Sequence, residues 1–420
     1  MRIQFAGDLA GTGFGTVTRD LGLALLNVGH DVRFVSQNDT GDDLEEPFAS
    51  RTFRVTPDLV DMEVASIVGA GSSMALSVEG ILKLIRGELW QDGWKPEAAI
   101  LLGDFVSVRR LVMADEDTIA AFQAVPTYHY VPIEGVDLPP AWRLLWQILH
   151  PIAMSEFGAD EIAKVTGTRP PVIYHGVDTE QFHPVSPERP LYMETEKQTI
   201  KLRSKAECKR FFGGDPKSRW ILRTDRLMPR KRYGSFLRAL APVLAERTDT
   251  LLMMHCRSSD EGGHLYDLIS KYPRPIAERM LISGFHDRFG GAPRDVLTAL
   301  YNAADVYASC SAEGFGLTIA EALACGTPAV GMDYSAVPEV IGPGGLLAPI
   351  NRLDDNEYDH AWATVDEPSF GRAVAEMLDN DLRRRSMGRA GAEHVRTTFS
   401  WTAAARQFGE VMEARLEAVA

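Results

Sequence analysis

The feature that most constrains the fold is an alternation of short apolar strands and helix-forming segments, which begins at the N-terminus and begins afresh near Trp220. The first stretch contains a predicted strand at Ile3–Ala6, a glycine-rich turn at Gly11–Gly15, a helix at Val17–Leu26 and a second strand at Val32–Val35. A strand–helix–strand opening implies a parallel sheet that helices cover on both faces. The sequence therefore predicts an α/β fold.

The second half repeats this pattern, and a chain of 420 residues is too long for one ordinary hydrophobic core. We therefore expect two α/β domains. The predicted strands that follow the opening lie at Ala98–Leu102, Ala124–Tyr130, Val172–Tyr174, Trp220–Arg223, Leu251–His255, Met280–Ser283, Val306–Ser309 and Ala329–Gly331. Further predicted helices lie at Gly234–Leu244 and Ser400–Ala420.

A stretch rich in prolines and charges, between Phe182 and Gly214, is the best candidate for a linker. The predicted organisation is an N-terminal domain at residues 1–183, a linker or insertion at 184–214, a C-terminal domain at 215–399 and a final helix at 400–420. Two α/β units joined in this way suit a ligand cleft between them.

Composition narrows the classes of protein. A hydrophobic content of 45% and a charged content of 24% are typical of soluble globular proteins. No stretch approaches the roughly 18 consecutive apolar residues that span a bilayer, and the first residues lack the apolar region of a signal peptide. The four scattered cysteines suggest neither a zinc site nor a disulfide frame. We expect a cytoplasmic protein whose net charge of −14 disfavours sequence-independent binding to nucleic acid or anionic lipid.

The richest local motif is the string from Glu313 to Glu321, Glu-Gly-Phe-Gly-Leu-Thr-Ile-Ala-Glu, in which two carboxylates bracket a small-residue turn that opens a helix. Backbone N–H groups at a helix start, together with the helix dipole, favour an anion such as phosphate. Carboxylates beside a phosphate fit only if they accept hydrogen bonds from something neutral, and sugar hydroxyls are the natural candidates. The motif therefore predicts a ligand that is part phosphate and part sugar.

With Gly-Thr-Pro at residues 326–328 after it, this string resembles the signature of retaining glycosyltransferase family 4. The resemblance implies the GT-B fold, in which two Rossmann-like domains face each other across a cleft and a C-terminal helix returns to the first domain. It implies that Glu313 binds the donor sugar and Glu321 the ribose of the nucleotide. The backbone around Phe315, Gly316 and Leu317 would meet the diphosphate.

A second motif concentrates cations in an otherwise acidic chain, at residues 223–232, Arg-Thr-Asp-Arg-Leu-Met-Pro-Arg-Lys-Arg. A diphosphate would explain such a concentration. The resemblance places Arg226 and Lys231 on the donor diphosphate, where with Gly316 they would stabilise the leaving group. Arg232 stands where relatives usually have glycine, so the turn that follows is expected to differ.

The glycine turn at residues 11–15 leaves a dehydrogenase to be weighed, because it follows a strand and precedes a helix. A dinucleotide fingerprint needs glycine at its sixth place, where this chain has Thr16, and the only ribose-binding acid on offer, Asp39, lies in a polar loop. A purely structural turn is the other alternative. The resemblance instead puts Gly13 and Gly15 near the donor phosphate and the acceptor.

The acceptor side is less defined. Asp104 follows one predicted strand and His129 lies near the end of the next, where α/β folds place ligands, and both are our candidates for contacting the sugar or the acceptor. A structural role is the alternative for each. We assign His175 and Asp178 to turns at the end of the first domain. The acids of Asp115-Glu-Asp117 are interpreted as a helix start, so no metal ligand is predicted.

These features predict a retaining glycosyltransferase that needs no cofactor and uses a nucleotide-diphosphate sugar as co-substrate, with a UDP-sugar placed ahead of a GDP-sugar. The resemblance implies no protein nucleophile. Instead, the leaving phosphate would deprotonate the acceptor hydroxyl. The acceptor stays open among glycan, lipid, small molecule, protein and modified DNA. A nucleotide-sugar epimerase and a non-catalytic nucleotide-sugar sensor of the same fold are the alternatives that the sequence leaves standing.

Overall fold

A computed structural model of the chain describes residues 1–9, 12–36, 44–54, 83, 85–88, 90, 92–113, 116–195, 198–284, 292–356 and 360–419. These residues form two compact units, which are described separately. Unit 1 contains Met1–Gly176 and the C-terminal segment that starts at Trp401. Unit 2 contains Val177–Asn356 and Ala361–Ser400.

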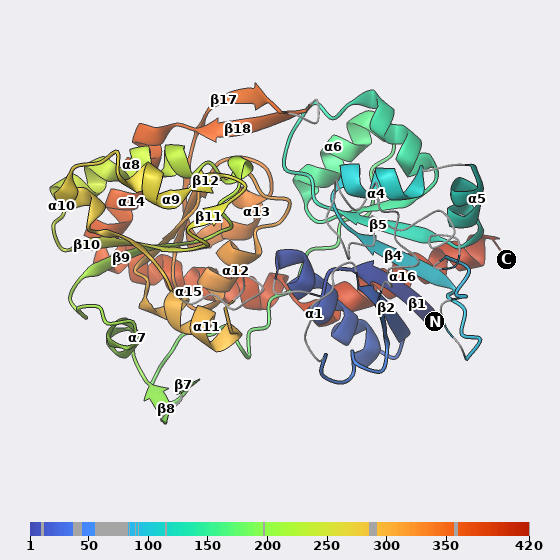
Figure 1. Cartoon of the computed structure of the whole chain (residues 1–420), viewed down its shortest axis with the longest axis horizontal. Coiled ribbons are helices and arrows are strands. Elements are labelled where there is room, and N and C mark those ends of the chain that lie inside the picture. Colours follow the sequence, from blue (N-terminus) through green and yellow to red (C-terminus); the bar gives the residue numbers. More distant parts are fainter. Residues whose placement is uncertain are drawn as a thin grey trace. The chain divides into compact units, whose positions relative to one another are not determined.

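Unit 1 is built on a parallel sheet in the order β3-β2-β1-β4-β5-β6, which has six strands within the described residues (Figure 1). Its strands are β1 (Arg2–Gly7), β2 (Asp31–Ser36), β3 (Thr52–Arg54), β4 (Ala98–Leu102), β5 (Thr127–Val131) and β6 (His150–Ala153). Its helices are α1 (Gly13–Asn27), α4 (Phe105–Val112), α5 (Glu116–Ala124), the 3-10 helix η3 (Pro140–Gln147), α6 (Glu156–Thr166) and α16 (Trp401–Val419).

The central strands of this sheet are apolar throughout because both of their faces are covered. Every residue of β4 and β5 is buried. Helix α16 packs against α1, so the last helix of the chain belongs to the same unit as the first strand. The strand order reverses direction between β1 and β4, which is the topological switch point of a dinucleotide-binding fold.

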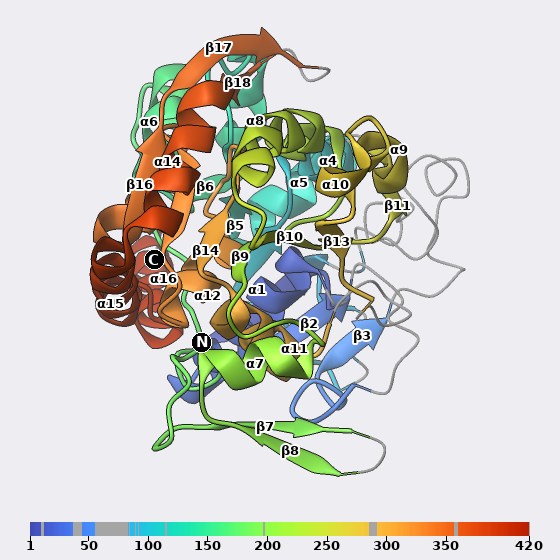
Figure 2. The same cartoon turned by 90° about the vertical axis from the view of Figure 1, so that its left-hand side faces the viewer.

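Unit 2 repeats the same topology with a parallel sheet in the order β13-β10-β9-β14-β15-β16, again six strands within the described residues (Figure 2). These strands are β9 (Arg219–Thr224), β10 (Thr250–His255), β13 (Met280–Ile282), β14 (Val306–Ala308), β15 (Ala329–Met332) and β16 (Gly345–Ala348). Here the switch point lies between β9 and β14.

Helices cover this second sheet, and short hairpins lie beside it. The helices are α7 (Lys205–Phe211), η4 (Pro229–Lys231), α8 (Tyr233–Glu246), α9 (Leu265–Ile269), α10 (Arg274–Ala277), α11 (Arg294–Ala303), α12 (Leu317–Ala324), α13 (Val337–Ile341), η5 (Gly342–Gly344), α14 (Glu367–Asp379) and α15 (Asp381–Thr398). The hairpins pair β7 (Leu191–Glu194) with β8 (Thr199–Leu202), β11 (Ser259–Asp260) with β12 (Gly263–His264), and β17 (Ile350–Asp355) with β18 (Ala361–Val365).

The predicted α/β class and the two Rossmann-like sheets are confirmed, and most strand predictions fall within a few residues of the observed bounds. The strand predicted at Val172–Tyr174 is wrong, because only an isolated bridge between Ala153 and Val172 forms there. The glycine turn also differs from the prediction. Gly13 and Gly15 lie in the first turn of α1, which Thr12 caps by accepting a hydrogen bond from the Gly15 N–H at 3.0 Å. Gly11 and Asp39 lie outside the described residues.

The predicted linker has secondary structure of its own. Residues 184–214 include the β7–β8 hairpin and α7, which pack on α11 within unit 2. The boundary between the units falls at Gly176 and Val177, before the predicted one at 183/184. Prolines and charges marked this segment as irregular, but Leu191, Met193 and Leu202 point inward and are buried, which anchors it. Within the described ranges, no helix is long and apolar enough to cross a membrane.

Candidate active site

The polar residues of unit 2 gather where β9 and β14 end, at the switch point of its sheet. Residues 225–232 follow β9, and residues 309–316 follow β14 and lead into α12. Because β9 and β14 are parallel neighbours, their carboxyl ends lie at the same edge of the sheet. Open α/β sheets bind ligands at such an edge. The two motifs predicted from the sequence therefore meet at one place.

At this edge the Lys231 ammonium lies between two carboxylates. It donates to Glu313 Oε1 and forms an ion pair of 2.9 Å with Asp225 Oδ1. All three side chains are largely buried. Burial alone would raise the pKa of the Asp225 carboxyl, but Lys231 and Arg223 outweigh it and hold the pKa below its usual value. Asp225 is therefore a permanent anion beside the lysine.

Arg223 supports this cluster from inside the core. Its guanidinium is fully buried, donates from Nε to Asp225 Oδ2 at 2.9 Å, and donates from Nη2 to the Lys231 carbonyl. It also lies over the rings of Tyr233 and Phe236, at 4.1 and 4.5 Å from their centroids. A buried cation needs such partners to offset its lost hydration. Arg223 thereby fixes both the carboxylate and the backbone that carry the lysine.

Glu313 is held by its own loop. Ser311 donates to Glu313 Oε1 at 2.8 Å, and the Glu313 N–H donates to Ser335 Oγ at 2.9 Å. The other carboxylate oxygen, Oε2, lies 3.9 Å from Arg230 Nη1. Glu313 thus has one oxygen in the buried cluster and one on the side of a half-exposed arginine.

The loop after Glu313 turns sharply into α12. Gly316 has φ of +105°, a backbone conformation that favours glycine, and no side chain caps the helix. The first N–H groups of a helix have no partner within it and attract anions. Phe315 is buried and packs edge-on against Phe399, with ring centroids 5.1 Å apart. Phe315 therefore anchors the loop, while the backbone of Gly316 and Leu317 provides the anion-favouring helix start.

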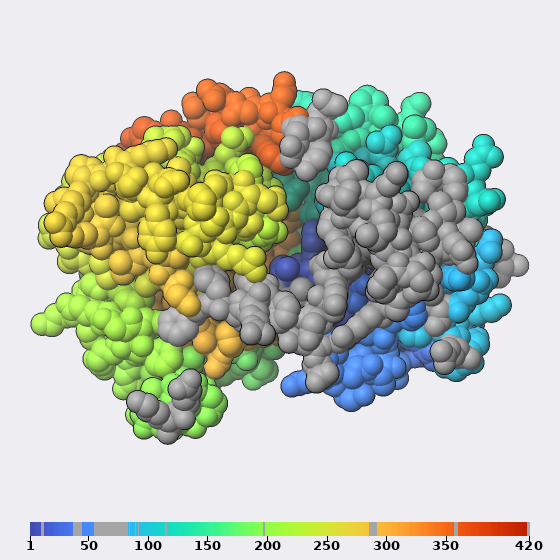
Figure 3. All heavy atoms as spheres, in the orientation of Figure 1, coloured from blue at the N-terminus to red at the C-terminus, as the bar shows by residue number. Residues whose placement is uncertain are grey.

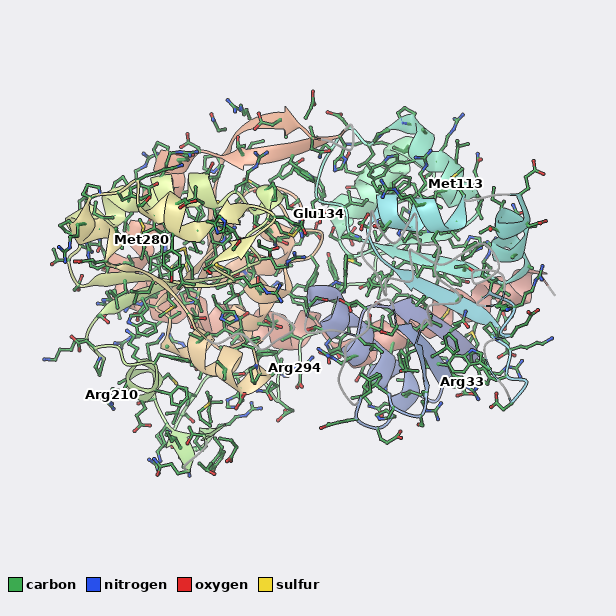
Figure 4. All side chains as sticks on the ribbon, in the orientation of Figure 1. Arg33, Met113, Glu134, Arg210, Met280 and Arg294 are labelled. Carbon is green, nitrogen blue, oxygen red and sulfur yellow. The ribbon has the colours of Figure 1, made fainter. Side chains whose placement is uncertain are left out.

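Glu321 lies within α12 and belongs to a second polar group. Tyr301, on α11, donates its hydroxyl to Glu321 Oε2 at 2.7 Å and lies 3.1 Å from Thr224 Oγ1. Burial raises the pKa of Tyr301 well above its usual value, so the phenol keeps its proton. Figure 4 labels Arg294, the first residue of α11, and Met280, the first residue of β13. The carboxylate predicted for ribose is thus oriented by a permanent donor.

Arg226, which is predicted to bind the donor diphosphate together with Lys231, pairs with acids outside the Lys231 cluster. Its guanidinium forms a two-point contact with Asp260, at 3.0 and 2.8 Å, and an ion pair of 3.2 Å with Glu261. These acids belong to the β11–β12 hairpin and its turn, among the yellow residues of Figure 3. Arg226 remains half-exposed. These contacts use Nε and Nη2, and a guanidinium has further N–H donors on Nη1.

Arg232, which stands where relatives usually have glycine, adopts the conformation that glycine favours. Its φ is +51°, at the junction of η4 and α8. Its guanidinium lies 3.7 Å from Asp354. The arginine therefore takes up a left-handed conformation that is uncommon for a residue with a side chain.

The histidine predicted for the acceptor side, His129, lies in the core of unit 1. It is completely buried, with Nε2 3.1 Å from the Gly103 carbonyl and Nδ1 accepting from Trp146 at 3.3 Å. Burial lowers the pKa of its imidazole to about 4, so the ring is neutral at physiological pH. Both ring nitrogens are used, so the assignment of His129 to ligand contact is corrected to a structural role.

Asp104 caps α4 by accepting from the backbone and the hydroxyl of Ser107, at 2.9 and 2.7 Å. It is exposed, so helix capping is its observed role and ligand contact stays a prediction.

The Tyr130 hydroxyl lies 2.7 Å from His175 Nδ1, and Asp178 caps a turn by accepting from Glu180 and Gln181, as expected of architectural residues. Asp115 lies outside the described residues.

Sequence reasoning missed three contributors to the site, namely Asp225, Ser311 and Ser335. Asp225 could have been found, because an acid between two arginines directly after an apolar strand has to be paired with one of the cations. The two serines carry no such signal, since hydroxyls are common in every loop.

Comparison with known proteins bears on the family and the fold of the chain. Residues 218–367 match the family model described as "Glycosyl transferases group 1". The predicted resemblance is therefore confirmed for the larger part of unit 2, which carries a domain of that family.

Two curated relatives illustrate the match. The GDP-mannose-dependent monoacylated alpha-(1-6)-phosphatidylinositol monomannoside mannosyltransferase of Corynebacterium glutamicum is 25% identical over 235 residues, which is 54% of this chain and 51% of the relative. A D-inositol 3-phosphate glycosyltransferase of the same species is 38% identical over 122 residues, which is 28% of this chain and 26% of the relative. The chain thus spans about half the length, or less, of these relatives.

Solved structures share the fold over the whole chain. Sucrose-phosphate synthase from Thermosynechococcus elongatus has a TM-score of 0.71 at 18% identity and covers 100% of both chains. Anabaena HepE in complex with UDP-glucose has a TM-score of 0.68 at 15% identity, and the match covers 99% of this chain and 100% of HepE. At such low identity the likeness shows the fold alone, and it confirms the predicted GT-B architecture.

Proposed function

We propose that this chain, whose second unit carries a domain of the group 1 glycosyl transferases, moves a sugar from a nucleoside diphosphate sugar to an acceptor hydroxyl. The observation that carries the proposal is the contact between the Lys231 ammonium and the Glu313 carboxylate beside the uncapped start of α12. A cation and open N–H groups suit a diphosphate, and the carboxylate next to them suits sugar hydroxyls.

The donor would lie along the edge of the second sheet. Its diphosphate would meet Lys231 and the backbone of Gly316 and Leu317, while its sugar would meet Glu313. The ribose would reach Glu321, whose orientation is fixed by Tyr301. Arg226 would join the diphosphate through Nη1, which its contacts with Asp260 and Glu261 do not use. In the first unit, Gly13, Gly15 and Asp104 remain our candidates for contacts to the donor or the acceptor.

We propose a retaining reaction, in line with the resemblance of the Glu313–Glu321 string. The bond between the anomeric carbon and the diphosphate oxygen breaks, and the acceptor oxygen bonds to the same face of that carbon. The acceptor proton passes to the leaving diphosphate. Negative charge grows on the diphosphate as the bond breaks, so Lys231 and the start of α12 would stabilise the transition state more than the ground state.

The test is a panel of nucleotide sugars, with UDP-glucose, UDP-N-acetylglucosamine and GDP-mannose among them, measured for binding and for slow hydrolysis. UDP-sugars stay ahead of GDP-sugars in our proposal, although one relative is named as GDP-mannose-dependent. Wild type should bind at least one donor and release nucleoside diphosphate, whereas Glu313→Ala should lose the release. Glu246→Ala, an exposed carboxylate at the end of α8, is the matched control and should behave as wild type.

The alternatives give different results in the same assay. Epimerised sugar without transfer would identify an epimerase, and donor binding without turnover for any acceptor would identify a sensor. Absence of binding across the whole panel would refute a nucleotide-sugar donor altogether.

A further inference from the structure

The pairing of Lys231 with two carboxylates limits which ligands the site accepts. A lysine ammonium has three N–H donors, and Asp225 and Glu313 take two of them. The exposed fractions of the three side chains are small, at 9% for Lys231, 3% for Asp225 and 11% for Glu313. Charges in such a setting are poorly screened by water, so a phosphate that approaches Lys231 has to compete with both carboxylates.

The two carboxylates differ in how firmly they are held. Asp225 is engaged on both oxygens, with Oδ1 on Lys231 and Oδ2 on Arg223 and on Ser309, the latter at 3.2 Å. Its partner Arg223 is itself completely buried. Glu313 engages Lys231 and Ser311 through Oε1, while Oε2 has, among the residues that the structure describes, only Arg230 in ion-pair range, at 3.9 Å. Glu313 is therefore the carboxylate that can exchange the lysine for another partner.

Charge makes this exchange selective. Arg223, Arg230 and Lys231 bring three positive charges to the cluster, against two negative charges on Asp225 and Glu313. A nucleoside diphosphate without sugar brings its own negative charge next to Glu313 and offers it no donor. A sugar-carrying nucleotide offers hydroxyl donors that Glu313 can accept once it leaves Lys231.

We propose that Glu313 is a specificity-determining residue that makes the site prefer the sugar-carrying nucleotide to the free nucleoside diphosphate, because it competes with phosphate for Lys231 unless a sugar engages it. This inference rests on the proposed donor class. After sugar transfer, Glu313 takes Lys231 back and weakens the hold on the product nucleotide. The carboxylate would thus serve product release as well as donor recognition.

The test is a set of calorimetric titrations of the full chain with UDP, GDP, UDP-glucose and GDP-mannose. Glu313→Gln keeps the size of the side chain and removes its charge. The variant should bind the nucleoside diphosphate roughly tenfold more tightly than wild type, which corresponds to about 1.4 kcal/mol. The sugar-carrying nucleotide should gain nothing or bind more weakly, so the ratio of the two dissociation constants should collapse towards one.

Controls separate charge competition from other causes. Glu246→Gln makes the same charge-removing change at an exposed carboxylate at the end of α8, and should leave nucleoside diphosphate affinity unchanged. The gain from Glu313→Gln should shrink in a Lys231→Gln background, because the competition acts through that lysine. An undiminished gain there would mean that the new amide binds phosphate directly, and would overturn the proposal.

The specificity role of Glu313 and the proposed donor class can be refuted separately. If wild type binds a nucleoside diphosphate and Glu313→Gln binds it equally or more weakly, the specificity role falls while the donor class stands. If neither protein binds any of the four nucleotides, the proposed function falls and this inference falls with it.

Discussion

The two sheets of the molecule have equivalent strand orders, but the polar side chains predicted to bind ligands have different surroundings in the two units. In unit 1, His129 lies in the middle of β5 and is sealed in the core by neutral hydrogen bonds to Gly103 and Trp146. In unit 2, the ends of β9 and β14 carry Lys231 and Glu313 in a chain of ion pairs. Topology alone therefore does not decide which edge binds a charged ligand.

A ligand-binding edge requires polar groups that can change partners. Neutral groups whose hydrogen bonds are all made gain nothing by exchanging partners, so they stabilise the unit instead. A paired charge near the surface can exchange its partner for a ligand of the same sign. Unit 2 has such a charge in Lys231, whose partner Glu313 can give way to a phosphate, while the fold holds Asp225 and Arg223 in place.

The contrast between the two units depends most on Lys231, whose loss should have the largest effect on activity. Lys231→Gln should lower kcat/KM for sugar transfer or donor hydrolysis by roughly 100- to 1,000-fold, the usual effect of removing one group that stabilises a developing oxyanion. Steady-state kinetics would measure it, with circular dichroism to confirm the fold. A loss smaller than about threefold would contradict the assignment of the diphosphate to this lysine.

Low pH should destabilise unit 1 more than unit 2. Burial lowers the pKa of His129 to about 4, of His150 to about 4 and of His175 to about 3, all in unit 1. The unfolded value is about 6.5, so the unfolded chain binds more protons and stability falls as pH drops from about 6.5 towards 4. For completely buried His129 the loss is about 3 kcal/mol at the lower end.

Unit 2 should resist this range better. The pKa of the Asp225 carboxyl is lowered in the folded state, so this group costs unit 2 stability only as pH falls below about 4. The pKa of His183, also in unit 2, is lowered in the same direction as those of the unit 1 histidines. Hydrogen exchange at pH 7 and pH 5 would measure the effect for each unit. Equal loss of protection in both units would contradict the prediction.

A substitution in the core of unit 1 should lower stability and leave nucleotide binding unchanged. His129→Leu leaves the Gly103 carbonyl and the Trp146 N–H without their partners, so the free energy of unfolding should fall by about 1–3 kcal/mol. Affinity for nucleoside diphosphates should stay within twofold of wild type. Urea denaturation and calorimetry measure the two quantities. A stable protein that has lost binding would restore His129 as a ligand residue.

The smallest expected effect concerns Glu321. If its carboxylate accepts from the ribose, wild type should bind 2′-deoxy or 3′-deoxy nucleoside diphosphates about tenfold more weakly than the ribonucleotide. Glu321→Gln should lose most of that discrimination, whereas Tyr301→Phe, which removes the orienting hydroxyl, should keep part of it. Identical discrimination in Glu321→Gln and wild type would argue against a ribose contact.

The sequence predicted the parallel sheets well because buried parallel strands are short apolar runs, as at Ala98–Leu102. It also placed Lys231 and Glu313 in one site, since both motifs follow strands. It could not show that Arg226 is paired with Asp260, because ion pairing across 34 positions depends on how a hairpin folds. Nor could it show that His129 is sealed, because the depth of one side chain depends on helices elsewhere in the chain.

The most direct test of the central claim is a crystal structure of the full chain with a nucleotide sugar from the panel that binds. The account predicts that the diphosphate contacts Lys231 and the N–H groups of Gly316 and Leu317, with sugar hydroxyls on Glu313. A diphosphate bound at the sheet edge of unit 1, or away from Lys231 in unit 2, would contradict it.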